Sequence, residues 1–168
     1  MRVEEQSRCM STFEDNSPDG SPLEIVNSRL LAAPRELVFE AFSNPKHLVH
    51  WWGPKGFTNT FREFDLRPGG AWRFVMHGPD GTNYPIEQVF LEVVRPERIV
   101  LQHLEQMHRF QMTMTFEERS GKTMLVWRML FESAAGNTKL KDFILEANEQ
   151  NFDRLEAHLG KMAGQTDS

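Results

Sequence analysis

Polar side chains recur along one alternating stretch of the sequence in a pattern that could support proton transfer. Tyr84, Gln88 and Glu92 fall on one face of a strand predicted there. If that face points into an apolar interior, a buried Glu92 has a raised pKa suited to acid–base catalysis. If the alternate residues point inward, Glu92 is solvated, and this is favoured because unpaired carboxylates are rarely buried. Tyr84 remains a candidate ligand-binding residue in both cases, because its ring can pack while its hydroxyl orients a ligand.

Histidine pairs raise the question of a metal site. His47 and His50 are three apart on a predicted helix, and His103 and His108 flank a predicted turn. Zinc takes three or four protein ligands, and neither pair has a third nearby in the sequence. We therefore interpret all four as exposed histidines and predict no metal. No nucleotide-binding, metalloprotease or serine-hydrolase motif occurs, so no catalytic residue and no cofactor are assigned.

Aromatic and methionine side chains are the most unusual feature, with 13 Phe, 4 Trp and 9 Met in 168 residues. Core packing must account for most of them, and the narrower hypothesis is that some line a cavity for a small apolar ligand. Asn148 is among the candidates because a polar side chain on the apolar stripe of a predicted helix must be hydrogen-bonded or face a wet space. The candidate cavity residues are Trp51, Phe74, Met76, Tyr84, Phe90, Met112, Met114, Trp127, Phe143, Asn148 and Phe152.

The adjacent tryptophans in HWWGPKGF call for separate predictions. Neighbouring residues on a helix point about 100° apart, so one ring can face inward while the other faces elsewhere. We predict that Trp51 points toward the cavity and that Trp52 packs the helix on the sheet.

Charge and composition exclude several partner classes. The chain has 19 basic and 24 acidic residues, a formal charge of −5, and no run rich in Lys or Arg. Nucleic acid and anionic membranes both require a concentrated positive surface, so neither is an expected partner. A single cysteine, no apolar leader and no long apolar run indicate a reducing, cytoplasmic location.

The elements that must position these residues can be placed from periodicity and turn signals. Residues 1–22 are rich in small and acidic residues and predict a flexible tail. A strand is predicted over 23–32, followed by a short helix opened by Pro34 and a second opened by Pro45. Residues 57–131 then alternate with period two between turn signals, which predicts about six antiparallel strands.

A helix is predicted over about 137–159, with a flexible C-terminal tail over 161–168. The predicted fold class is α+β: a curved antiparallel seven-stranded sheet wrapped around a long C-terminal helix, in one domain over 23–160. Where a straight helix leaves a curved sheet, the gap is the place for a ligand.

Several segments in matching order carry a family resemblance: WWGP, DLRPGG, RFVMHGPDG, VFLEVVRPERIV and FDRLEAHL. Together they resemble the family of homologues of the activator of heat-shock protein 90 ATPase, in the START/SRPBCC superfamily with its helix-grip fold. The resemblance covers about residues 23–160 and implies a hydrophobic cavity between sheet and helix.

Three functions follow from that resemblance. Relatives in the superfamily bind lipids, sterols or polyketides, so the first expectation is a non-enzymatic protein that binds a small apolar or amphipathic ligand. Activation of a heat-shock protein 90-type chaperone is the second. In the eukaryotic activators the matching domain is the second of two, and here only the tail stands in place of the first. A polyketide cyclase or aromatase using Tyr84 or Glu92 is the third.

Overall fold

The computed structural model describes residues 23–104, 109–132 and 138–166. One long and two short helices accompany seven strands within that part of the chain. In chain order the elements are β2 (Leu23–Leu31), α1 (Arg35–Ser43), α2 (Pro45–Trp51), β3 (Thr58–Phe64), β4 (Ala71–His77), β5 (Asn83–Val94), β6 (Arg98–His103), β7 (Phe110–Arg119), β8 (Lys122–Phe131) and α3 (Thr138–Thr166). The predicted tail over 1–22 and His108 lie outside the described residues.

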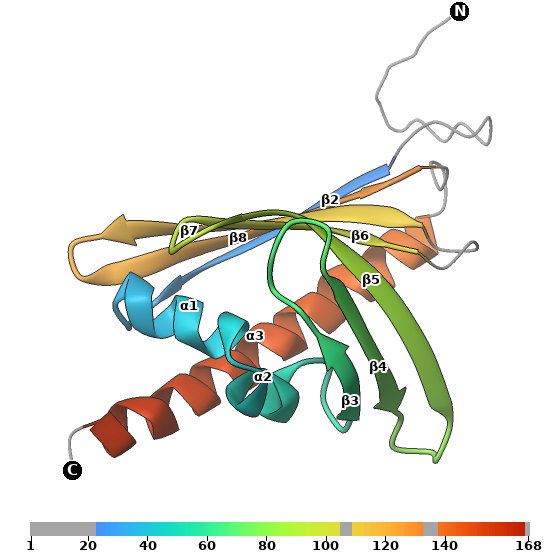
Figure 1. Ribbon diagram of the computed structural model, residues 1–168, viewed down its shortest axis with the longest axis horizontal. Helices are drawn as coiled ribbons and strands as arrows, with labels where there is room; N and C mark the ends of the chain where they lie inside the picture. Colours follow the sequence, from blue (N-terminus) through green and yellow to red (C-terminus); the bar gives the residue numbers. More distant parts are fainter. Residues whose placement is uncertain (1–22, 105–108, 133–137, 167–168) are drawn as a thin grey trace, which may run out of the picture.

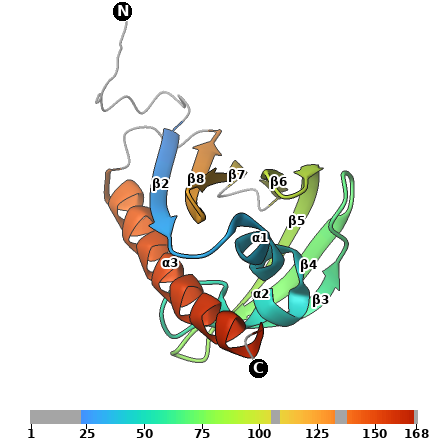
Figure 2. The ribbon, with the colours of Figure 1, turned by 90° about the vertical axis from the view of Figure 1, so that its left-hand side faces the viewer.

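The strands form one antiparallel sheet in the order β2-β8-β7-β6-β5-β4-β3, which confirms the predicted seven-stranded antiparallel sheet. Strands β3 to β8 follow one another as a meander, and β2 pairs with β8 at the edge. The sheet is strongly curved, and Figure 1 shows β3, β4 and β5 sweeping away from the plane of β2, β7 and β8. Seen from the end in Figure 2, the strands form an arc that holds α1 and α2, and α3 closes the arc beside β2. The predicted α+β architecture, a sheet wrapped around a C-terminal helix, is therefore confirmed.

Local sequence explains where the two short helices begin and end. Pro34 precedes α1, and its fixed backbone angle suits a helix entrance. Pro45 occupies the first turn of α2, where the Asn44 side chain accepts a hydrogen bond from the Lys46 amide. Gly53, at a φ of +103°, then turns the chain toward β3 in a conformation that glycine adopts without steric cost.

A β-bulge in β5 decides which residues of that strand face inward. The pairing with β6 shifts between Phe90 and Glu92, so Leu91 is an extra residue without a direct partner. Gln88 and Phe90 are buried before the bulge, whereas Val93 packs against the core after it. The inward-facing positions of the strand therefore change at Leu91, so Tyr84 and Glu92 do not lie on the same face of β5.

Helix α3 is longer than the sequence pattern predicts. It continues past residue 159 to Thr166, so residues 161–166 of the predicted C-terminal tail are helical. Met162 is 3% exposed and belongs to the core with Phe152, Leu155 and Leu159. The buried stripe thus continues beyond the predicted end because Met162 reaches the same packed interior.

One hydrophobic core joins the sheet to all three helices. Its largest fully buried side chains include Trp51, Trp72, Trp127, Phe74, Phe90, Phe116 and Phe152. Among the described residues, no helix combines the length and apolarity that crossing a membrane requires.

Candidate functional site

Trp52 lies at the centre of an aromatic cluster between α2 and the sheet. Its ring centroid is 5.0 Å from that of Trp72 on β4 and 5.3 Å from that of Trp127 on β8. Phe152 of α3 meets Trp127 edge-on at 4.8 Å. We call Trp52, Trp72, Trp127 and Phe152 the tryptophan cluster, and all four side chains are nearly or fully buried.

Two indole N–H groups in the tryptophan cluster have no hydrogen-bond acceptor among residues 23–104, 109–132 and 138–166. The Nε1 atoms of Trp72 and Trp127 are buried and lack a partner within the part of the chain that the structure describes. Trp51 differs, because its Nε1 donates to the Ala41 carbonyl oxygen at 3.0 Å. A buried donor without an acceptor costs about 1–3 kcal/mol, so two in one cluster need an explanation.

A buried polar pair lies next to Trp72. Gln88, directly opposite Trp72 on β5, has its side-chain nitrogen 3.1 Å from Nδ1 of His103 on β6. The Gln88 Oε1 atom is buried and without a partner among the described residues. His103 is 7% exposed and its ring stacks on Phe110, so the prediction of an exposed histidine was wrong. The buried side chains of Gln88 and His103 therefore place hydrogen-bonding groups within the apolar core.

Helix α3 holds the turn after α2 through side-chain hydrogen bonds. Asn151 accepts from the Gly53 amide at 3.2 Å and donates to the Trp51 carbonyl at 2.8 Å. Arg154 donates to four carbonyls, those of His50, Trp52, Gly53 and Pro54.

These bonds satisfy the open carbonyls at the end of α2, and burial lowers the pKa of the Arg154 guanidinium. The turn that carries Trp52 is thus fixed by α3. Met76 lies against the same turn, with its Cε atom 3.2 Å from where a side chain at Gly53 would begin.

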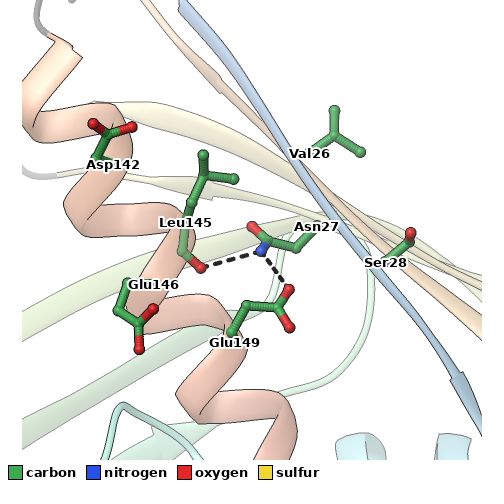
Figure 3. Close-up of a pocket in the computed structure, with 7 residues that line it drawn as sticks. All are labelled: Val26, Asn27, Ser28, Asp142, Leu145, Glu146 and Glu149. Atoms are coloured by element: carbon green, nitrogen blue, oxygen red, sulfur yellow. Dashed lines mark hydrogen bonds between the residues drawn. The ribbon is translucent and has the colours of Figure 1, made fainter.

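A second network joins α3 to the edge strand β2. Figure 3 shows Asn27 pointing from β2 to the helix, where its Nδ2 donates to the Leu145 carbonyl and to Glu149. Asn148 donates to Asn27 Oδ1 at 3.0 Å and contacts the Met129 sulfur at 3.4 Å. Asn148, a predicted cavity residue, is therefore buried and hydrogen-bonded in the contact between helix and sheet.

Arg29 completes that contact with three carboxylates of α3. It binds Glu149, Asp153 and Glu156 at 2.7–2.8 Å, and its guanidinium lies over the Phe152 ring. Burial alone would lower the pKa of Arg29, but the hydrogen bonds to these carboxylates outweigh it and raise that pKa. Acidic residues of α3 therefore gather on the side that faces β2.

The predicted cavity residues divide into an inward group and an outward pair. Deeply buried members, at 4% exposure or less, are Trp51, Phe74, Phe90, Met112, Met114, Trp127 and Phe152. Met76 is half-buried. Phe143 is 69% exposed and Tyr84 is 43% exposed, so neither ring contributes to the buried cluster.

Trp51 and Trp52 have distinct surroundings. Trp51 packs edge-on against Phe42 of α1 at 4.7 Å and uses its N–H within the helical layer. Trp52 packs on the sheet, as predicted, and its ring contacts the indoles of both Trp72 and Trp127, whose N–H groups have no acceptor among the residues described. Trp72 is not among the predicted cavity residues, although alternation places it on the same strand face as Phe74 and Met76, and it is 2% exposed.

Glu92 has the environment of a solvated, ion-paired carboxylate. It binds Arg98 through two hydrogen bonds of 3.1 and 2.7 Å, and its side chain is 45% exposed. The hydrogen bonds with Arg98 lower the pKa of the Glu92 carboxyl. This is opposite to the raised pKa that acid catalysis requires, and it agrees with the alternative in which Glu92 is solvated.

The architecture is that of a helix-grip protein: a curved antiparallel sheet, two short helices after the first strand, and a long C-terminal helix in its grip. The family model described as activator of Hsp90 ATPase homolog 1-like protein matches residues 32–160. The chain belongs to this family.

Solved structures similar to this chain support the fold. A protein from Nitrosomonas europaea is 24% identical, with a TM-score of 0.72 over 84% of this chain and 97% of its own. One from Arthrobacter aurescens is 21% identical, with a TM-score of 0.73 over 88% and 90%. The AHSA1 protein from Silicibacter pomeroyi is 19% identical, with a TM-score of 0.69 over 83% and 99%. No curated protein gives a significant match.

Proposed function

We propose that this protein binds a small, largely apolar molecule carrying a hydrogen-bond acceptor at the tryptophan cluster. The observation that carries the proposal is the pair of buried indole N–H groups, on Trp72 and Trp127, that have no acceptor in the described part of the chain. A carbonyl, ether or hydroxyl oxygen of a ligand would satisfy such donors, and the gain is larger in a low-dielectric interior than in water.

The lining favours an apolar body for that ligand. Trp52 touches both sheet tryptophans, and Met114 is the direct cross-strand neighbour of Trp127. Aromatic rings supply large apolar contact areas, and methionine side chains repack at small cost to make room. A polar tip on an apolar molecule matches this mixture of surfaces.

Gln88 supports a ligand with a second polar group. Its Oε1 atom is a buried acceptor without a partner among the described residues, on the strand next to Trp72. A hydroxylated sterol, fatty alcohol or polyphenol offers both a donor and an acceptor. These are the classes with which a screen should begin.

The test uses pairs of ligands that share a carbon skeleton and differ in one oxygen. Thermal shift and calorimetric titration against such pairs should show binding only, or about tenfold tighter, for the member with the acceptor, as expected for one good hydrogen bond of about 1.4 kcal/mol. Trp72→Phe or Trp127→Phe, whichever removes the donor that bonds the ligand, should remove this preference, while Trp51→Phe, whose N–H is already bonded, should keep it. Equal binding of both members to every variant would contradict the proposal.

A second candidate is chaperone activation, and the family match over residues 32–160 is the observation that favours it. The chain would then dock on a heat-shock protein 90-type chaperone and raise its ATPase rate. A coupled ATPase assay with the chaperone of the same organism tests this, and an unchanged rate at excess protein would reject it.

The cyclase or aromatase hypothesis has lost its basis. It required Tyr84 or Glu92 to point into a buried cavity. Tyr84 is 43% exposed, and Glu92 is ion-paired with Arg98 at the surface. We therefore do not propose a reaction.

A further inference from the structure

A basic hollow lies on the side of α3 that faces α2, apart from the tryptophan cluster. Its volume is about 450 Å³, and it is open to solvent. Its lining consists of His50, Arg154, Ala157, His158, Lys161 and Met162, and no carboxylate is among them. We call this site the basic hollow.

Its charge is a local exception in an acidic protein. The whole chain carries a formal charge of −5. On α3 the acids Glu149, Asp153 and Glu156 face β2, where Arg29 binds them. Arg154 and Lys161 lie on the other side of the helix, in the hollow. These five charges thus lie on two faces of the helix, with the three acids toward β2 and the two cations in the hollow.

Three histidines meet in and beside the basic hollow. Nδ1 of His47 is 3.0 Å from Nε2 of His158, and the His50 ring stacks on the His158 ring at 6.0 Å. Burial, and then the charges of His47, His50 and Lys161, lower the pKa of His158. His47, His50 and Lys161 thus act on His158, and Arg154 lines the same hollow. A bound anion would offset these positive charges and so favour the protonated form of His158.

The side chains that line the basic hollow differ in mobility and in polarity. Arg154 is fixed by its bonds to the carbonyls at the end of α2, so it forms a rigid positive wall. Lys161 is exposed and flexible enough to reach a ligand. Met162, buried at 3% exposure, and Ala157 supply an apolar surface beside these charges.

We propose that the basic hollow binds a small organic anion: a carboxylate or phosphate group attached to a compact apolar body. Lys161 and protonated His158 hold the anionic group, and Met162 and Ala157 contact the apolar part. Nε2 of His158 is hydrogen-bonded to Nδ1 of His47, which leaves the Nδ1–H of protonated His158 for the anion. Binding therefore takes up one proton and strengthens as the pH falls. This inference does not depend on the ligand proposed for the tryptophan cluster.

Benzoate and phenyl phosphate are the probes for the test, with inorganic phosphate as the anionic group alone. An NMR pH titration of the full chain should show the His158 pKa raised by at least one of the two aromatic probes. Calorimetry should show that probe binding more tightly at about pH 6 than at about pH 8. Comparison of the two probes identifies which anionic group is preferred.

Matched charge variants separate the hollow from the general charge of the protein. Lys161→Gln should weaken probe binding about three- to fivefold, the effect of one exposed ion pair. Lys139→Gln, an equal change at the other end of α3, should leave binding unchanged. The proposal is wrong if neither probe moves the His158 titration or if both variants weaken binding equally. Inorganic phosphate binding as tightly as phenyl phosphate would exclude the apolar contact.

Discussion

At the residue scale, the four tryptophans differ in how their N–H groups are used. Trp51 donates to Ala41, in the last turn of α1, where carbonyls have no intrahelical partner. Trp72 and Trp127 are equally buried but donate to nothing among the described residues. Similar side chains thus make different contributions to stability, and the difference can be measured.

Substitution of Trp51 by Phe should destabilise the protein more than the same change at Trp127. Both changes remove similar volume from the core, but only Trp51→Phe leaves a carbonyl oxygen without its donor. The additional loss should be about 1–3 kcal/mol in the free energy of unfolding, measured by urea denaturation. Equal losses in the two variants would show that the Trp51 hydrogen bond has no net value.

At the element scale, polar residues on the apolar stripe of α3 attach it to neighbouring segments. The sequence pattern identified Asn148 and Asn151 as polar side chains on or beside this stripe that must be hydrogen-bonded or wet. Both are hydrogen-bonded: Asn148 donates to Asn27 on β2, and Asn151 bonds the turn after α2. Buried amides here specify how the helix docks.

Replacing Asn151 by Ala should release the turn that carries Trp52. Asn151 is 4% exposed, and the change leaves the Gly53 amide and the Trp51 carbonyl unpaired. The expected loss is about 2–4 kcal/mol in the free energy of unfolding, with faster hydrogen exchange at Gly53. Gln150→Ala, which removes only exposed bonds, to the Lys55 amide and to Glu146, is the control and should cost about 0.5 kcal/mol or less. A Gly53 amide as protected as in the native chain would contradict this role.

The elements themselves could be predicted because their signals are local. Alternation such as Phe110, Met112, Met114 and Phe116 fixes a strand face, and turn residues separate the strands. The bulge at Leu91 could not be predicted, because neither Gly nor Pro marks it, and it reverses the inward face of β5. The extension of α3 was missed because Gly160 and Gly164 weaken the helix signal that Met162 maintains.

The candidate site was harder to predict than the fold, because its contacts join distant segments. Arg154 resembles any solvated helix cation in the sequence, and only the position of α2 shows that it binds four carbonyls. His47 and His50 lacked a third histidine within reach along the chain. His158 brings a third imidazole beside them from α3, 111 residues from His47. Within the part of the chain that the structure describes, no group of three or more His, Cys, Asp or Glu is arranged to hold a metal ion.

At the scale of the whole molecule, the contact between α2 and α3 should make stability depend on pH. Burial, with the charges of His47, His50 and Lys161, lowers the pKa of His158 below its ordinary value of 6.5. Between that lowered pKa and 6.5, the unfolded chain binds more protons than the folded one. The free energy of unfolding should therefore fall as the pH drops through this window and level off below it.

The slope should be well below about 1.4 kcal/mol per pH unit, the limit for one proton, because solvent screens a partly exposed ring. Urea denaturation at a series of pH values measures it, and His158→Asn should remove this component. The control is His77→Asn, because His77 lies on β4 and is not one of the three histidines that meet at the hollow. An unchanged pH dependence in His158→Asn would contradict the assignment.

The whole fold brings β4, β8, α2 and α3 to one place, the tryptophan cluster, and ligand binding there is the central claim. The most direct measurement is an NMR titration of the indole N–H signals with the tightest ligand of the oxygen-matched screen. We predict downfield shifts at Trp72 or Trp127, as expected when a free donor gains an acceptor, and little change at Trp51, whose N–H is already bonded. Binding that leaves the Trp72 and Trp127 signals unmoved would contradict the account.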